Sequence, residues 1–247
     1  ILGIEYIKSI LKLNSNIKPY TINRVNSGYN SLNINNSICS ASAIRNALKT
    51  DSLETINYTM PKPTYDLIND TVNSGVNLVY NDDFYQILSS IILRDKDNLT
   101  DYFEVNEGIE NKIYNSIFKC QNIEELQNEI KSKRYTMTKI SRTLNNIMLG
   151  IKRDDILKTK DLKEMPYVRV LAFNDKGCEI LKEIKKNSEI EVITKFSKIK
   201  YINSNIFNTL INYDIKATNM YNLIYYKDNF DMLKAPLDYI TSPKYIK

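Results

Sequence analysis

The sequence SASAIRNAL, residues 40–48, decides how the first part of the chain is interpreted. Its small and apolar side chains suit a helix, and Ser40 or Ser42 is placed to cap the N-terminus of that helix. The preceding stretch, Tyr20–Val25, alternates apolar and polar side chains, which indicates a short strand. A polar loop at 26–30 separates the two. With an apolar helix ahead of the strand, this order predicts one turn of an α/β fold.

The start of this predicted helix could bind an anion. Its free backbone N–H groups and the hydroxyls of Ser40 and Ser42 would face the ligand, and the helix dipole would strengthen the attraction. Arg45, one turn into the helix, adds a bidentate phosphate donor. Arg24, near the end of the predicted strand, could point into the same crevice. An ordinary capped helix with a surface arginine has the same spacing, and the spacing by itself favours that plainer interpretation.

The remainder of the chain has mostly helical periodicity. The segment at 60–63, Met-Pro-Lys-Pro, interrupts the chain and marks an expected domain boundary, and Pro166 marks another. Between them, helices are expected at 65–72, 82–93, 107–118, 123–131 and 138–149. Beyond Pro166, strands are expected at 168–173 and 191–194, with helices at 176–184, 205–211 and 217–225. Only six glycines and six prolines occur, which favours such a mainly helical chain.

The composition excludes several kinds of catalytic site. The chain has no histidine, so it holds no Ser-His-Asp triad, no Cys-His pair and no histidine-ligated zinc or haem. Its cysteines, Cys39, Cys120 and Cys178, are far apart, which favours reduced thiols in a cytoplasmic protein over disulfides or a protein-bound metal. No apolar run approaches the roughly 18 residues that would span a membrane.

The chain begins Ile-Leu-Gly, without an initiator methionine. Ile4, Ile7 and Leu11 follow at helical spacing, so we expect a helix that faces a core from the first residues. Since no cap or leader precedes that helix in the sequence, we interpret the chain as a fragment of a longer protein.

Positive charge is concentrated in one stretch. The chain as a whole carries +5, from 34 basic and 29 acidic residues. Nine basic residues lie between Lys131 and Lys160, and only Asp154 and Asp155 oppose them, so this stretch carries +7 and the remainder −2. The basic residues are Lys131, Lys133, Arg134, Lys139, Arg142, Lys152, Arg153, Lys158 and Lys160. A solvated helix face and a surface that binds a polyanion such as RNA both fit this pattern.

Six stretches resemble, in family order, the motifs of the bacterial tRNA(Met) cytidine acetate ligases. In the first part of the chain, ILGIEY at 1–6 resembles N-x-I-L-G-x-E-Y without its Asn, TINR at 21–24 with Gly28-Tyr29 resembles T-I-x-R…G-Y-H-D, and SASAIR at 40–45 resembles S-A-T-x-I-R. Further along, EGIENK at 107–112 resembles E-G-L-E-N-R, and KSKRYT at 131–136 with Arg142 resembles K-T-K-R-Y-T and a later R-x-L. The last of the six, YVRVL at 167–171, resembles Y-I-R-V-L-G-F. As a set, these matches are highly specific.

The resemblance implies a mainly α fold with α/β parts. Residues 1–60 would be the C-terminal part of a Rossmann-like nucleotidyltransferase domain of the HIGH type, 61–165 a helical tRNA-binding domain and 166–247 a small α/β segment. The activity implied is ATP-dependent: acetate becomes acetyl-adenylate with release of pyrophosphate, and the acetyl group passes to N4 of the wobble cytidine of elongator tRNA(Met). Mg²⁺ could accompany the ATP.

The same resemblance implies roles for individual residues. Arg24 would contact ATP, and Ser40, Ser42 and Arg45 would hold its triphosphate, stabilising charge as pyrophosphate leaves without any side-chain nucleophile. The residues expected to receive the tRNA backbone are Lys131, Lys133, Arg134, Lys139, Arg142, Lys152 and Arg153.

The chain also departs from the family pattern. The HxGH-type motif is missing, because the chain has no histidine, so we expect little or no ligase activity from these 247 residues alone. Ser42 stands for a threonine, which keeps the hydroxyl, and Asn30 and Ser31 stand for His-Asp, which leaves the role of that loop open.

Two other functions fit the same sequence. An adenylyltransferase for a small molecule would have no use for the basic stretch. A non-catalytic RNA-binding helical module would bind tRNA with strong salt dependence and have no affinity for ATP.

Overall fold

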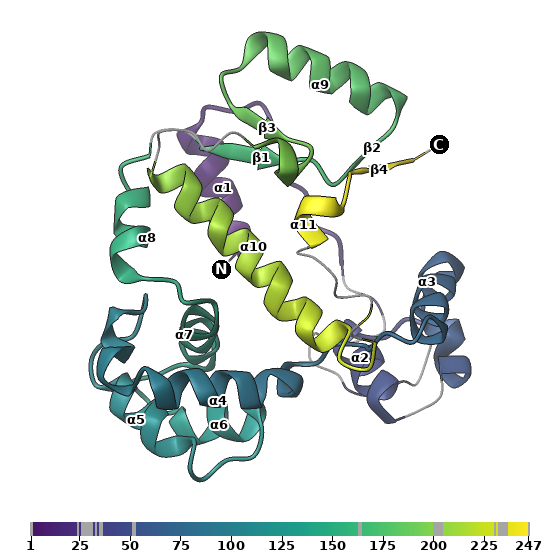
Figure 1. Cartoon of the computed structure of the whole chain (residues 1–247). Coiled ribbons are helices and arrows are strands. Elements are labelled where there is room, and N and C mark those ends of the chain that lie inside the picture. The colour runs from purple at the N-terminus through teal and green to yellow at the C-terminus, as the bar shows by residue number, and fades with distance from the viewer. Residues whose placement is uncertain are drawn as a thin grey trace. The chain divides into compact units, whose positions relative to one another are not determined.

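The computed structural model describes residues 2–23, 25, 32, 34, 37–50, 53–162, 165–199, 205–229, 231 and 237–246. The chain divides into two compact units, Ile1–Thr71 and Val72–Lys247, which are called unit 1 and unit 2 below. Helices dominate both units, as Figure 1 shows, and short strands occur only in unit 2 among the described residues. The predicted mainly helical fold with α/β parts is therefore confirmed, while the division into three domains stays a prediction.

Unit 1 is built from helices. They are α1 (Leu2–Lys12), α2 (Ala41–Thr50), the 3-10 helix η1 (Leu53–Thr59) and most of α3 (Lys62–Asn73), which continues into unit 2. Helix α1 forms where the apolar spacing predicts one, but none of its residues is buried. The expectation that it faces a core is therefore wrong within unit 1: its apolar residues, such as Ile4 and Leu11, are exposed because no described element of the unit covers them.

The strand predicted at 20–25 is absent from the described part of that stretch. Residues 20–23 and Val25 have no regular secondary structure, and Arg24 lies outside the described residues. The side chains of Tyr20 and Ile22 are 85% and 95% exposed. A strand needs a neighbouring strand for its backbone hydrogen bonds. The described residues of unit 1 contain none, so the alternating pattern here produces no sheet.

The first part of unit 2 is a helical bundle. It contains η2 (Asn81–Phe84), α4 (Tyr85–Arg94), η3 (Lys96–Asp101), α5 (Ile109–Ser116), α6 (Ile123–Ile130) and α7 (Met137–Leu149). These helices confirm the periodicity-based predictions, with starts and ends that follow from local capping. The Asn122 side chain accepts from the backbone N–H of Glu125 at 2.8 Å to begin α6, and Gly150 adopts φ +71° to end α7.

The core of the bundle is mainly apolar. On α7 the side chains of Ile140 and Ile147 are fully inaccessible to solvent, and they meet Ile92 of α4 and Ile113 of α5 in one cluster. Each such burial stabilises the fold by about 1.5–3 kcal/mol. Tyr135 closes the cluster, and its hydroxyl donates to the carbonyl of Glu107 at 2.6 Å.

The second part of unit 2 combines short parallel strands with helices. After α8 (Arg153–Thr159) come β1 (Tyr167–Arg169), β2 (Ala172–Phe173), α9 (Asp175–Asn187), β3 (Glu191–Ile193), η4 (Phe196–Lys198), α10 (Asn205–Tyr225), α11 (Leu237–Ile240) and β4 (Lys244–Tyr245). The single strand predicted at 168–173 is two strands, because β1 pairs with β3 while β2 pairs with β4. The two helices predicted at 205–225 are one continuous helix, α10.

Helix α10 is bonded to the elements beside it through the hydroxyls of half-buried tyrosines. Tyr213 on α10 donates to Asp155 of α8 at 2.7 Å and accepts from the backbone N–H of Lys152 at 3.1 Å. Tyr167 of β1 donates to Asp214 of α10 at 2.7 Å. Burial and the carboxylate raise the pKa of Tyr213 to about 12, so this link stays protonated at neutral pH. Among the described helices, none combines the length and apolarity of a transmembrane span.

Candidate functional site

The start of α2 is where the sequence predicts an anion site. Ser40 is 1% exposed and caps the helix: its hydroxyl oxygen accepts from the N–H of Ala43 at 3.0 Å, and its carbonyl accepts from the N–H of Ile44 at 3.1 Å. Of the two serines that could cap the helix, Ser40 does so. Ser42 is half-buried in the first turn.

Arg45 lies one turn further along α2 and is exposed. No carboxylate of the described residues forms an ion pair with it, so its guanidinium is available to an anion. The structure therefore brings Ser40, Ser42 and Arg45 to the first turns of one helix. Arg24, the fourth predicted ATP contact, lies outside the described residues, and the roles of all four residues stay predictions.

The seven residues predicted to contact tRNA lie in unit 2 and are called the basic surface. They extend from the end of α6 through the loop at 131–136 and along α7 to the start of α8. The set comprises Lys131, Lys133, Arg134, Lys139, Arg142, Lys152 and Arg153. Their side chains differ in what they contact, and this difference was not visible in the sequence.

Carboxylates from the segment 101–107 neutralise part of the basic surface. Glu107 lies 3.6 Å from Nε of Arg134 and 3.5 Å from Nζ of Lys139. Glu104 accepts a hydrogen bond from Nε of Arg142 at 3.0 Å, and its other carboxylate oxygen lies 2.9 Å from Nη2 of the same arginine. Within the basic stretch of the sequence, only Asp154 and Asp155 oppose the positive charges. Glu104 and Glu107 come about 30 residues before the cations that they contact, so the sequence alone did not indicate that they oppose them.

The backbone of this acidic segment is shaped to present its carboxylates. Glu104 and Glu107 both adopt left-handed conformations, with φ of +64° and +62°, which non-glycine residues rarely adopt. Backbone strain of this kind costs about 1–3 kcal/mol and persists where the surroundings hold it in place. Here the Tyr135 hydroxyl holds the Glu107 carbonyl, and the Asn146 side chain donates to the carbonyl of Phe103 at 2.9 Å.

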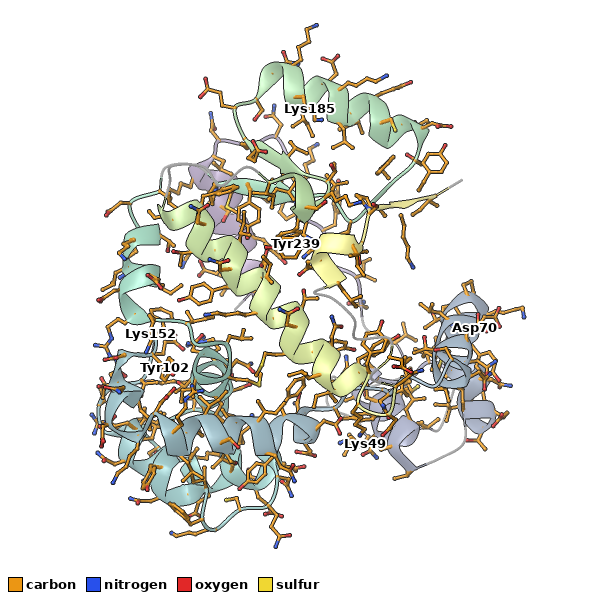
Figure 2. All side chains as sticks on the ribbon, in the orientation of Figure 1. Lys49, Asp70, Tyr102, Lys152, Lys185 and Tyr239 are labelled. Atoms are coloured by element: carbon orange, nitrogen blue, oxygen red, sulfur yellow. The ribbon has the colours of Figure 1, made fainter. Side chains whose placement is uncertain are left out.

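The far end of the basic surface is held by a polar cluster. Nζ of Lys152 lies 4.1 Å from the ring centre of Tyr102 and 3.6 Å from a carboxylate oxygen of Asp101. Figure 2 labels Lys152 and Tyr102, which lie side by side. Arg94 and the Tyr102 hydroxyl both donate to Asp95, and these bonds lower the pKa of the Asp95 carboxyl to about 2.

Three members of the basic surface have no ion-pair partner among the described residues. Arg153 donates to the carbonyl of Val105 at 2.8 Å, so its charge is held in place without being neutralised. Lys131 and Lys133, in the loop between α6 and α7, are exposed. The strongest uncompensated positive charge of the basic surface therefore lies at the α6–α7 loop.

No metal centre is formed by the residues that the structure describes, since no three of their cysteine and acidic side chains gather around one point. The three cysteines are free thiols and partly buried. Burial, with a smaller contribution from Glu129, raises the pKa of the Cys120 thiol, which makes it a poor nucleophile at neutral pH.

Comparison with known proteins identifies the family. The model of the HIGH nucleotidyl transferase family matches residues 1–235. A tRNA(Met) cytidine acetate ligase from Clostridium acetobutylicum is 46% identical over 227 residues, which cover 91% of this chain and 53% of the relative. The chain thus spans about half the length of the curated relatives that it matches.

Solved structures of Thermotoga maritima TmcAL share the fold. The apo crystal form superposes with a TM-score of 0.86 at 25% identity, over 99% of this chain and 59% of that one. A second crystal form, bound with alpha-thio ATP, gives a TM-score of 0.82 at 24% identity, over 99% of this chain and 58% of that one. The chain therefore belongs to the HIGH nucleotidyl transferase family, and within it the chain is similar to the tRNA(Met) cytidine acetate ligases.

Proposed function

We propose that this chain serves the ATP-dependent activation of acetate and the transfer of the acetyl group to N4 of the wobble cytidine of elongator tRNA(Met). The observation that carries the proposal is the 46% identity to a tRNA(Met) cytidine acetate ligase over 91% of the chain. A match over 91% of the chain is too long to leave out either the serine-rich helix start or the basic surface, and this supports a shared substrate set. An RNA substrate of this kind also favours the cytoplasm.

The ATP part of the proposal rests on the start of α2. Ser42, Arg45 and the first backbone N–H groups of the helix would bind the triphosphate, while buried Ser40 would hold the helix start in place. Arg24 would complete the set. Fixed donors of this kind stabilise the charge that develops on pyrophosphate as acetyl-adenylate forms. Mg²⁺ would travel with the nucleotide, and no protein-bound metal is needed for this step.

The tRNA part rests on the basic surface. Phosphates would first meet Lys131 and Lys133, whose charges have no ion-pair partner among the described residues. Arg142 and Lys139 would contact RNA by replacing their ion pairs with Glu104 and Glu107 by ion pairs with phosphate oxygens. Since both carboxylates are reached by solvent, this exchange costs little. Contacts of this kind position the RNA without reading its sequence.

A binding experiment tests the tRNA part. The affinity of the chain for a labelled elongator tRNA(Met) transcript is measured by fluorescence anisotropy at several salt concentrations, for the wild type and for the double variant R134E/R142E. We expect steep salt dependence for the wild type and a slope that falls by about one for each lost phosphate contact. A small-molecule adenylyltransferase would bind no tRNA, and its ATP affinity would be the same in both proteins.

A second experiment tests the ATP part. Isothermal titration with ATP should show binding that Arg45→Ala weakens severalfold, whereas Lys49→Ala, on the same helix, should leave it unchanged. A non-catalytic RNA-binding module would bind tRNA but would release or absorb no heat of binding when titrated with ATP. Incubated alone with ATP, acetate and tRNA, the chain should form little N4-acetylcytidine, because it has no histidine for an HxGH motif. Robust product would contradict that expectation.

A further inference from the structure

A cavity lies in the helical bundle between η2, α4, α6 and α7. Its volume is about 100 Å³, and its apolar floor is formed by the buried side chains of Leu88, Ile123 and Leu144. The volume is several times the roughly 10–15 Å³ that one water molecule requires and well below the roughly 300 Å³ at which pockets for larger ligands begin. The cavity therefore suits a single ring and not a whole nucleoside triphosphate.

Polar side chains surround the opening of this cavity. Three of them are amides, Asn81, Gln127 and Asn145, and the fourth is the hydroxyl of Ser141. None of the four side chains hydrogen-bonds to another residue in the described part of the chain. Ser141 and Asn145 lie one turn apart on α7, and Gln127 lines the same cavity from α6, so all three side chains border one space.

This combination of groups matches the chemistry of a nucleobase. A base has two apolar faces and an edge of hydrogen-bond donors and acceptors. Asparagine and glutamine amides can form two hydrogen bonds at once with such an edge. The floor residues would contact one face. Met148 and Phe84, which also line the cavity, are side chains that pack well on an aromatic ring. A purely apolar ligand that filled the cavity would leave the half-buried side chains of Gln127 and Ser141 without partners, which costs free energy, whereas the exposed Asn81 and Asn145 would stay hydrated.

The position of the cavity beside uncompensated charge points to RNA. The N–H of Lys131 donates to the carbonyl of Gln127 at 3.0 Å, so this lysine follows directly after the helix that supplies the cavity amide. Lys133 comes two residues later in the same exposed loop. A nucleotide whose base entered the cavity would therefore have lysines of the basic surface close to its phosphate backbone.

We propose that this cavity binds one unstacked base of a single-stranded RNA segment, with Gln127, Ser141 and Asn145 bonding its edge. The inference rests on the proposed function in that it takes RNA as the substrate, and it adds a contact that reads a base where the basic surface reads only phosphates. The site lies within unit 2 and is separate from the helix start proposed for ATP.

The test uses the double variant Q127M/N145L, which removes two amides while keeping volume and net charge. Its affinity is measured by fluorescence anisotropy at several salt concentrations, for elongator tRNA(Met) and for a 12-nucleotide oligocytidine. We expect about tenfold weaker binding of both RNAs, since one lost base contact is worth roughly this factor, with an unchanged salt slope. K131A/K133A should instead lower the slope by about two. Asn128→Leu, on α6 outside the cavity, is the matched control and should bind like the wild type.

The outcomes separate this inference from the proposed function. Wild-type affinity of Q127M/N145L for both RNAs would overturn the base site. A salt slope reduced as in the lysine variant would also overturn it. If the double variant does not fold, Ser141→Ala decides, with about threefold weaker binding expected. Binding of oligocytidine but not of tRNA(Met) by the wild type would refute the proposed function, and the cavity would still be tested by the oligocytidine arm.

Discussion

Helix α7 of the bundle and helix α1 of unit 1 arise from similar amphipathic patterns and have different surroundings. On α7 the apolar stripe is buried, and Ile140 and Ile147 are completely inaccessible to solvent. On α1 the apolar residues at the same spacing, including Ile4 and Ile7, remain exposed, and no residue of the helix is buried. Apolar spacing therefore determines that a helix forms, whereas its burial depends on what other parts of the protein offer.

The largest expected difference between the two helices is in their contribution to stability. Ile140→Ala should lower the free energy of unfolding of the bundle by about 2–5 kcal/mol, because it leaves a cavity in a packed core. Ile7→Ala, the matched change on α1, should alter it by less than about 0.5 kcal/mol. Urea denaturation followed by circular dichroism measures both. Equal losses would mean that α1 is packed as firmly as α7.

The caps of the two units offer a second comparison. Ser40→Ala should destabilise α2 by about 1–2 kcal/mol, because the N–H of Ala43 loses its partner in a buried place. Thr136→Ala at the start of α7 should cost about 0.5–1 kcal/mol, because that hydroxyl is exposed and its bond to the N–H of Lys139, at 3.3 Å, is longer. Amide hydrogen exchange at residues 43 and 139 reports each effect. A larger loss at Thr136 would reverse this ranking.

Removing one tyrosine hydroxyl should destabilise the bundle and leave the stability of α1 unchanged, with a smaller effect than the changes above. Tyr135→Phe removes the hydrogen bond to the Glu107 carbonyl and should cost about 1 kcal/mol. It should also loosen the segment that presents Glu107 to the basic surface. Tyr6→Phe on α1 removes an exposed hydroxyl and should leave the midpoint of urea denaturation unchanged. Equal midpoints for the two variants would show that the Tyr135 hydrogen bond contributes nothing.

A further comparison is the dependence of bundle stability on pH. The Asp95 carboxyl has its pKa lowered to about 2, mainly by the Arg94 hydrogen bonds, so it stabilises the bundle above its ordinary pKa of about 4. That contribution is lost as the pH falls from about 4 to about 2. Burial raises the pKa of Tyr102 to about 12, so its contribution is complete below pH 10 and is lost between about 10 and 12.

Single variants identify the groups responsible for the loss of stability at acid pH (the acid limb) and at alkaline pH (the alkaline limb). Asp95→Asn should flatten the acid limb of a stability profile measured by urea denaturation, and Tyr102→Phe should flatten the alkaline limb. Glu5→Gln on α1, which breaks an exposed ion pair with Lys8 at 2.8 Å, is the matched control and should change neither limb. An unchanged acid limb in Asp95→Asn would exclude this carboxyl as its source.

Local sequence signals predicted the bundle well, and signals that depend on distant partners were missed. The helices at 82–149 follow from apolar periodicity and from caps such as Asn122 and Gly150, which lie within a turn of the residues that they serve. The predicted strand at 20–25 depended on a neighbouring strand, and the charge of the basic surface depended on Glu104 and Glu107. The described residues of unit 1 hold no partner strand, and the two carboxylates are distant in sequence from the cations that they contact, so neither outcome could be predicted from local spacing.

The candidate sites show the same limit. The serine-rich helix start was predicted because capping is local, and the structure selects Ser40 as the cap. The cavity in the bundle was not predicted, because its amides come from three elements, and Asn81 and Asn145 are far apart in the chain. An amide that does not cap a helix and lies beside a buried stripe, as Asn145 does on α7, is the one sequence signal that could have indicated it.

The pairing of β2 with β4 has a consequence for the order in which the protein folds during synthesis. Lys244 of β4 pairs with Ala172 of β2, so this sheet cannot close until the ribosome has released the chain beyond residue 245. The helices of the bundle at 81–149 have all been synthesised well before that point, so the bundle can form much earlier. We therefore expect a period in which the bundle has folded while β2 has no partner strand, because β4 has not yet been synthesised. During that period the nascent chain would present the unpaired edge of β2 to neighbouring molecules.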